Sequence, residues 1–335
     1  MTKATPLLER GVPERGAAGI AILAILLISA GSLSGQTTAP ALARGLAVAG
    51  SERPASVPAG FVITPFGYFH PSCALRIGEA DTLSDGRVKH KNESSDAKIP
   101  DCRYAHYTRT GSMVSADTRQ AKEAREPVIN GWLESVQTTT DTWYDGITAT
   151  WTVPPEPPVN DQQTIFFFPG FEDTINNLSI VQPVLQWYYP GPWTLASWNC
   201  CLAGNVFESN PLKAKPGDSI YGAVVPMCKK GSGYCPDWKI VSENQTTGRK
   251  TSIRKAGIEG QVWNWAFGAV LEVYGVKQCI DFPPDSSLAM SVQLYDQNRQ
   301  LIGNPGWYPV PADPGTDPSC PYGLIVTPTE QTLEY

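Results

Sequence analysis

The sequence is poor in charge and very poor in histidine. Only 17% of its 335 residues are charged, the net charge is -6, and the last of its 3 histidines is His106. An acidic chain of low charge lacks the basic field that phosphate backbones require, so no nucleic-acid partner is expected. After His106 the chain cannot build a Ser-His-Asp, Cys-His or histidine–zinc site unless the N-terminal part supplies the ring. Acid–base chemistry there must use carboxylates, helped by amides and aromatic side chains, and no metal or cofactor is expected.

Long hydrophobic runs are also missing. The longest apolar run covers residues 20–28, after Lys3, Arg10 and Arg15 and before a stretch of small residues. This order is typical of a signal peptide, and the run is too short to span a bilayer comfortably. We therefore expect residues 1–43 to be a signal peptide and processing region, with an uncleaved anchor as the alternative. The mature protein is expected to be secreted or periplasmic, monomeric and without stable membrane association.

The sequence contains eight cysteines, which in an exported chain predict disulfides. Cys228 and Cys235 flank a Gly-containing turn, so a local bridge that closes a hairpin is predicted there. Cys200 and Cys201 are neighbours, and neighbouring residues on a strand point to opposite faces. We therefore expect these two to bridge to different partners rather than to each other.

The composition changes near residue 128. All ten tryptophans lie after it, and the 30 glycines and 30 prolines of the chain favour short strands and turns over helices. Residues 44–127 are predicted to be an N-terminal extension or a propeptide that ends in a helix over residues 115–126. Residues 128–335 carry strand patterns, the clearest being the strict apolar–threonine alternation of residues 146–153. An all-β, two-sheet antiparallel β-sandwich is predicted for this part.

Two predicted strands carry polar residues on a defined face. Within residues 262–274 the odd positions are apolar and are expected to enter the core, so that Glu272 and Tyr274 project from the opposite face. A carboxylate among apolar side chains without a local cation should have a raised pKa. Residues 178–188 place Gln182 and Gln186 on one face, while Pro183 indicates an edge strand or a bulge. The pattern leaves open that Glu272 and Gln182 are simply solvated.

These two strands resemble the catalytic segments of the eqolisins, a family of glutamic peptidases. Residues 180–187, Ile-Val-Gln-Pro-Val-Leu-Gln-Trp, are similar to the family stretch that supplies a catalytic glutamine, and residues 268–274 are similar to the strand that supplies the glutamate. Four further segments follow the family's order: residues 130–132, 148–154, 216–220 and 244–248. Residues 168–173 and 197–201 depart from the family pattern, although an acid remains at Glu172 and a tryptophan at Trp198.

The resemblance implies a secreted acid endopeptidase with a polypeptide substrate. Glu272 would act as base and then acid on a bound water, and the side-chain amide of Gln182 would donate to the oxyanion. Residues implied to line the substrate are Glu172, Gln186, Trp187, Trp198 and Tyr274.

Two other functions are compatible with the same fold. The first is a catalytically inactive module that binds carbohydrate or protein in a concave groove lined by Trp187, Tyr188, Trp193 and Trp198. The second is a glycosidase that uses Glu272 and Glu172 as a carboxylate pair.

Overall fold

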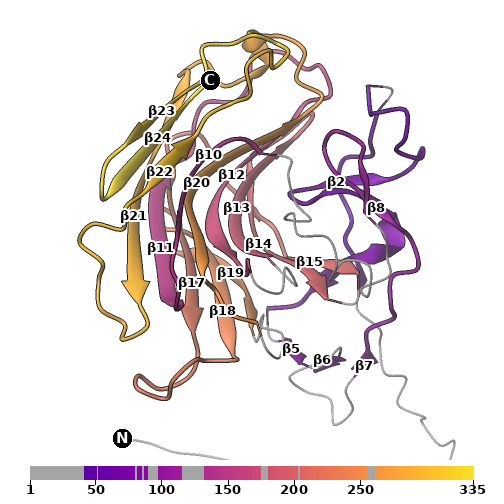
Figure 1. The fold of residues 1–335 in the computed structure, drawn as a ribbon. Coiled ribbons are helices and arrows are strands. Elements are labelled where there is room, and N and C mark those ends of the chain that lie inside the picture. Colours follow the sequence, from indigo (N-terminus) through magenta and orange to yellow (C-terminus); the bar gives the residue numbers. More distant parts are fainter. Residues whose placement is uncertain are drawn as a thin grey trace, which may run out of the picture. The chain divides into compact units, whose positions relative to one another are not determined.

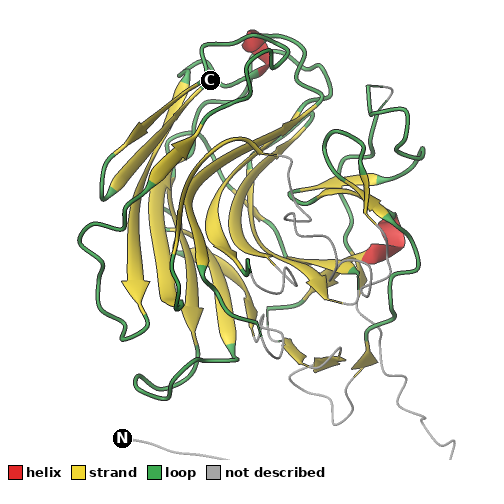
Figure 2. Cartoon of the chain, in the orientation of Figure 1, coloured by secondary structure: helices red, strands yellow, loops and turns green. Residues whose placement is uncertain are grey.

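The computed structural model describes residues 41–50, 52–79, 81–84, 87–89, 97–114, 132–174, 180–202, 204–254 and 261–335. Strands dominate this part of the chain, which also contains two short 3-10 helices, Pro71–Cys73 and Cys279–Asp281 (Figure 2). The predicted signal sequence at residues 20–28 and the predicted helix at residues 115–126 lie outside the described residues. No helix within the described ranges is long and apolar enough to cross a membrane.

Two large sheets form a sandwich, which confirms the predicted fold class (Figure 1). The first sheet runs in the order β1 (Ala41–Leu42), β4 (Ala74–Ile77), β15 (Asn205–Ser209), β14 (Thr194–Leu202), β13 (Ile180–Tyr188), β12 (Thr164–Glu172), β20 (Trp265–Tyr274), β10 (Trp132–Thr139) and β22 (Tyr308–Val310), with β16 (Leu212–Lys213) paired to β14. The second runs in the order β23 (Gly323–Val326), β24 (Glu330–Glu334), β21 (Ser287–Asp296), β11 (Tyr144–Thr152), β17 (Ser219–Pro226), β18 (Trp238–Asn244), β19 (Arg249–Arg254), β5 (Thr82–Ser84), β6 (Arg87–Lys89) and β7 (Ala97–Lys98).

Strand β11 shows why these residues form a sandwich. Ile147, Ala149 and Trp151 are buried in the core between the sheets, whereas Thr150 and Thr152 are turned away from it. The predicted alternation is confirmed, because a strand with one apolar face gains stability only when that face is covered by a second sheet.

Strand β20 follows its predicted alternation over only half of its length. Ala269, Leu271 and Val273 enter the core between the sheets as expected. The pairing of β20 with β10 shifts register between Ala269 and Phe267. A bulge therefore interrupts the alternation there. Phe267 therefore packs on the opposite face of the sheet, and the prediction that it enters the core was wrong for this reason.

Pro183 lies in the centre of the first sheet, which corrects the prediction of an edge strand or a bulge. Its strand β13 pairs with β14 at Pro183 itself, opposite Ser197, while its pairing with β12 is interrupted between Leu185 and Val181. The opposing sheet makes room for the pyrrolidine ring at Gly222, where a Cβ atom would lie 2.7 Å from Cγ of Pro183 and 2.8 Å from Cη2 of Trp151. Because the ladder with β12 is interrupted at Pro183, the missing N–H of proline removes no hydrogen bond from that pairing.

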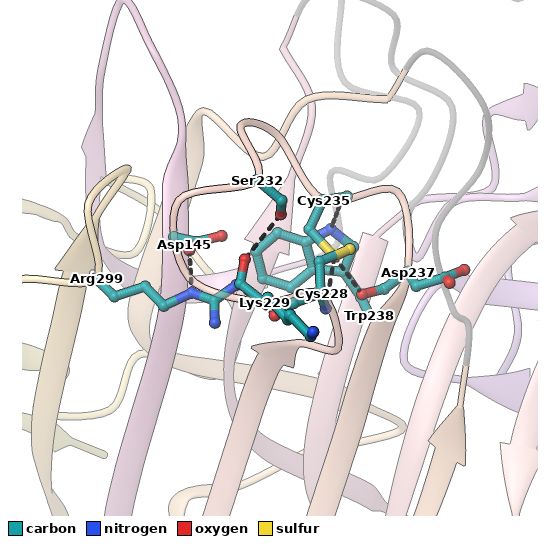
Figure 3. Close-up of a disulfide and its surroundings, with 8 residues drawn as sticks. All are labelled: Asp145, Cys228, Lys229, Ser232, Cys235, Asp237, Trp238 and Arg299. Carbon is teal, nitrogen blue, oxygen red and sulfur yellow. Dashed lines mark hydrogen bonds and ion pairs between the residues drawn. A yellow bond between two sulfur atoms is a disulfide. The ribbon is translucent and has the colours of Figure 1, made fainter.

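The disulfides agree with the prediction in one case and contradict it in another. Cys228 and Cys235 are bonded and close the loop between β17 and β18, where the ion pair of Asp145 with Arg299 also lies (Figure 3). Cys200 and Cys201 are bonded to each other, so the prediction of separate partners was wrong. The six remaining cysteines pair among themselves, as Cys73–Cys102, Cys228–Cys235 and Cys279–Cys320, and leave these two without another partner.

Residues 41–114, hereafter the N-terminal segment, are joined to the sandwich by non-covalent contacts. Strand β4 pairs in parallel with β15, and β5 pairs with β19, so the segment extends both sheets. It also forms a separate small sheet from β2 (Val62–Thr64), β3 (Gly67–Phe69), β8 (His106–Tyr107) and β9 (Met113–Val114). None of the four disulfides connects the segment to the sandwich.

The contact between Gly222 and Pro183 gives a stability prediction. We expect Gly222→Ala to lower the free energy of unfolding by about 1–3 kcal/mol, because the added methyl group meets two stiff rings in a closely packed core. Urea denaturation measures this effect. Gly303→Ala is the matched control, since a Cβ atom at Gly303 meets nothing within 4 Å. Equal stability of the two variants would contradict the packing described for Pro183.

Candidate active site

The candidate site lies on the face of the first sheet that is turned away from the sandwich core, here called the site face. Glu272 alternates with the core residues Leu271 and Val273 and therefore points to this face, as predicted. The register places Glu272 opposite Phe166, and Phe166 opposite Gln186. An acid and an amide thus lie in one row across three strands, with one phenylalanine between them. Both side chains are buried, Glu272 completely.

Gln182 lies on the same face but not in the same row. It is four residues from Gln186 along β13, which corresponds to about 13 Å along the strand. Its partner on β14 is Trp198. Gln182 is 0% exposed, and neither atom of its amide has a hydrogen-bond partner among the described residues. The register therefore makes Gln186 the amide in the row of Glu272, with Gln182 further along the same strand.

Glu172 occupies the far end of the site face. It pairs with Ile180, so it is a diagonal neighbour of Gln182 at roughly 7–8 Å between backbones. Along β12 it is six residues, about 20 Å, from the row that contains Glu272. The carboxyl groups of glycosidase pairs lie roughly 5–9.5 Å apart. This separation rules out the predicted glycosidase pair of Glu272 and Glu172.

The carboxyl group of Glu272 is held by one tyrosine. The hydroxyl of Tyr274 donates a hydrogen bond of 2.5 Å to Oε1 of Glu272, and Oε2 has no partner among the described residues. Burial raises the pKa of Glu272 to about 8, while the Tyr274 hydrogen bond and the positive charge of Arg109 act in the opposite direction. The raised pKa was predicted from the sequence, and its main cause is the loss of water around the carboxylate.

A third buried acid on this face, Glu208, was not predicted. Glu208 accepts a hydrogen bond of 3.0 Å from Nε2 of Gln186 and forms an ion pair with Arg76 of the N-terminal segment. Gln186 in turn accepts a hydrogen bond of 2.8 Å from Nε1 of Trp198. Burial raises the pKa of Glu208, and Arg76 and Gln186 oppose that shift. Nothing in the sequence signals this network, because Arg76 and Glu208 are 132 residues apart in a fold that must first be known.

The N-terminal segment covers the site face. The ring of Phe66 packs edge-on against Trp198 at 6.0 Å between ring centroids, and the ring of Tyr68 packs edge-on against Tyr274 at 5.1 Å. Apolar residues of the segment and of the site face form one continuous cluster, separate from the sandwich core. Glu272 is therefore closed off from solvent.

The tryptophans of the predicted binding groove are not gathered at the surface. Trp187 and Trp193 lie in the core between the two sheets, 5.4 Å apart between ring centroids, and Trp187 therefore points away from the site face. Trp198 is on the site face but is completely buried under the N-terminal segment. Of the predicted substrate-lining residues, the structure brings Glu172, Gln186, Trp198 and Tyr274 to one face and leaves Trp187 on the other.

The site face offers proton transfer and hydrogen-bond donation. It carries the carboxyl groups of Glu172 and Glu272, whose pKa values are both raised to about 8, and the amides of Gln182 and Gln186. Positioned carboxyls can donate and accept protons, and amides can stabilise an oxyanion. Among the described residues, no three His, Cys, Asp or Glu side chains are grouped as metal ligands would be.

The raised pKa values predict how stability depends on pH. Each of these carboxyl groups has a higher pKa in the folded than in the unfolded chain, about 8 against 4.5. Its contribution to the free energy of unfolding is therefore complete below pH 4.5 and is lost as the pH rises through about 8. We expect the melting temperature of the full chain to fall by a few degrees between pH 5 and pH 9. Calorimetric scans measure this, and Glu272→Gln and Glu172→Gln should each flatten the dependence. A melting temperature that rises over this interval would contradict the burial of these acids.

The fold is similar to solved structures of glutamic peptidases. A scytalidoglutamic peptidase bound to a peptide-based transition-state analogue matches with a TM-score of 0.45 and 14% identity over 61% of this chain and 98% of that chain. SCP-B, a member of the eqolisin family in complex with the tripeptide Ala-Ile-His, matches with a TM-score of 0.44 and 15% identity over 61% of this chain and 98% of that chain. Aspergilloglutamic peptidase from Aspergillus niger matches with a TM-score of 0.36 and 18% identity over 51% of this chain and 98% of that chain. No family model and no curated protein sequence matches the chain.

Proposed function

We propose that this protein is a secreted acid endopeptidase of the glutamic type, made in a covered form. The observation that carries the proposal is the site face, where the completely buried Glu272 shares one row with the buried amide of Gln186, and Gln182 lies further along the same strand. Burial of such groups without full hydrogen bonding costs stability, and perturbed acids of this kind cluster at functional sites. The sequence resemblance of these two strands to the catalytic segments of eqolisins supports the same assignment.

In the proposed reaction Glu272 removes a proton from a water molecule that attacks the scissile carbonyl, and then donates this proton to the leaving amine. The first step requires the ionised carboxylate. In the covered state the pKa of Glu272 is about 8, so in acid the group is protonated and cannot act as a base. Since burial is the main cause of that shift, removal of the cover lowers the pKa and lets Glu272 ionise at acidic pH.

The oxyanion donor in this proposal is an amide of β13. The sequence resemblance assigns this role to Gln182, whose amide has no partner among the described residues. The register instead favours Gln186, which lies in the row of Glu272. In the covered state Gln186 is engaged by Trp198 and Glu208, so it becomes available only if that network rearranges. Loss of one oxyanion donor typically costs about a hundred- to thousandfold in rate.

We further propose that residues 44–127 act as a propeptide and residues 1–43 as a signal peptide and processing region. Support for a removable cover comes from the absence of any disulfide between the described segment and the sandwich. The four disulfides fit an oxidising compartment, as expected for a secreted or periplasmic protein. After one cut between residues 114 and 132, only non-covalent contacts hold the segment in place.

The second candidate function is a binding module without catalysis. It is less well supported, because the aromatic groove on which it was based is divided between the core and the covered face. It becomes the better explanation if the uncovered protein binds glycans or peptides but cleaves none.

The proposed activity is tested by cutting the chain at a specific protease site inserted within residues 115–131 and assaying denatured protein substrates at pH 3–5. We expect cleavage by the cut protein and none by the uncut one. Glu272→Gln should abolish the activity, and Glu330→Gln, at an exposed position of β24 in the other sheet, is its control. Gln182→Ala and Gln186→Ala identify the oxyanion donor, since only one of them should cost the full hundredfold or more. Cleavage that persists in Glu272→Gln would contradict the assignment.

A further inference from the structure

A cavity lies at the edge of β10, between this strand, the loop after β22 and residues 109–110 of the N-terminal segment. Its volume is about 300 Å³. The edge strand β22 pairs with β10 only at Ser135, Val136 and Gln137. Strand β22 ends at Val310, and the next residue, Pro311, lines the cavity. Residues 132–134 therefore have no β22 partner on their outer side, and a short length of strand edge faces this cavity.

The cavity walls combine aromatic surface with hydrogen-bond donors. Trp132 and Trp265 form one wall, with their ring centroids 5.7 Å apart. Nε1 of Trp132 and Nε of Arg109 are buried N–H donors without an acceptor among the described residues. Glu134 also lines the cavity, and burial raises its pKa to about 8, so that it carries a proton at neutral pH. Buried donors without acceptors are costly, which indicates a ligand that brings acceptor oxygens.

The cavity adjoins the catalytic acid of the proposed function. Trp132 is the register partner of Glu272 at the end of β20. Arg109 comes from the N-terminal segment, and its charge is close enough to lower the pKa of Glu272. The cavity is therefore complete only while the segment covers the site face.

We propose that this cavity binds a carboxylate carried by an extended polypeptide, with Arg109 as the counter-ion and the Trp132 indole N–H as a second donor. Guanidinium–carboxylate pairs are among the strongest polar contacts in proteins, and the aromatic wall accepts the neighbouring apolar atoms. A polypeptide is favoured over an acidic oligosaccharide because the open edge of β10 presents backbone groups that pair with an added strand. Asp313 also lines the cavity, but its side chain is exposed, so water and salt screen its charge.

The consequence is a coupling between ligand binding and the covered state. A ligand that requires Arg109 binds the covered chain and not the uncovered one, so it stabilises the cover by mass action. Two sources supply the same carboxylate, namely the free C-terminus of a peptide and an acidic side chain within it. The inference concerns binding to the uncut chain and does not require that the protein cleave anything.

The test uses the full chain carrying Glu272→Gln, so that no bound peptide is hydrolysed, and isothermal titration near pH 6. Four N-acetylated octapeptides of one apolar sequence are compared: with a free C-terminus, with an amidated C-terminus, amidated with one internal Glu, and amidated with Gln in its place. We expect the free C-terminus or the internal Glu to improve affinity roughly tenfold or more over its neutral counterpart. The pair that shows the difference identifies the source of the carboxylate.

Arg109→Met should reduce the difference in affinity between the acidic and the neutral peptide to less than about twofold. Arg254 is an exposed cation on the outer face of the second sheet, and Arg254→Met should leave this difference unchanged. A second readout needs no variant at Arg109: the indole N–H resonance of Trp132 should shift with the acidic peptides and not with the neutral ones. Equal affinity for acidic and neutral peptides overturns the inference, as does a preference that survives Arg109→Met. Binding of a uronic acid oligosaccharide without binding of any peptide overturns it too. None of these measurements involves cleavage. The binding inference can therefore fail while the peptidase proposal stands, and the peptidase proposal can fail while the inference stands.

Discussion

The burial of the site face under the N-terminal segment is the constraint on which the rest of the structure depends. The polar side chains of Glu272, Gln182 and Glu208 are completely or almost completely buried beneath this contact. The fold compensates for it only in part. Glu208 gains Arg76, and Glu272 gains the Tyr274 hydroxyl and the nearby charge of Arg109, whereas the Gln182 amide gains no described partner. Buried polar groups without full hydrogen bonding cost stability, which the apolar contacts of the same interface must offset.

Local patterns in the sequence were sufficient for the main architecture. The strict alternation around Thr150 predicted a half-buried strand, and the apolar positions Leu271 and Val273 placed Glu272 on the outer face of its strand. These predictions succeed because alternation depends only on the period of two in a strand. The local Cys228–Cys235 bridge was predicted for a similar reason, since a short loop with a turn holds its two ends together.

Features that depend on distant parts of the chain were missed or predicted wrongly. The bulge that turns Phe267 outward comes from the pairing of β20 with β10, and the central position of Pro183 depends on Gly222 in the other sheet. The Arg76–Glu208 pair joins strands that become neighbours only in the folded chain. The offset between Gln182 and Glu272 is likewise a matter of register, which no single strand encodes.

Direct titration of the Glu272 carboxyl group tests the central claim, that the N-terminal segment holds this acid in its protonated form. Carbon-13 NMR of protein labelled at the glutamate carboxyls, with Glu272→Gln to assign the resonance, reports its pKa in the uncut chain and after release of the segment. The account predicts a value near 8 in the uncut chain and a clear decrease toward 4.5 after release. An ordinary pKa in the uncut chain, or the same value in both forms, would contradict it.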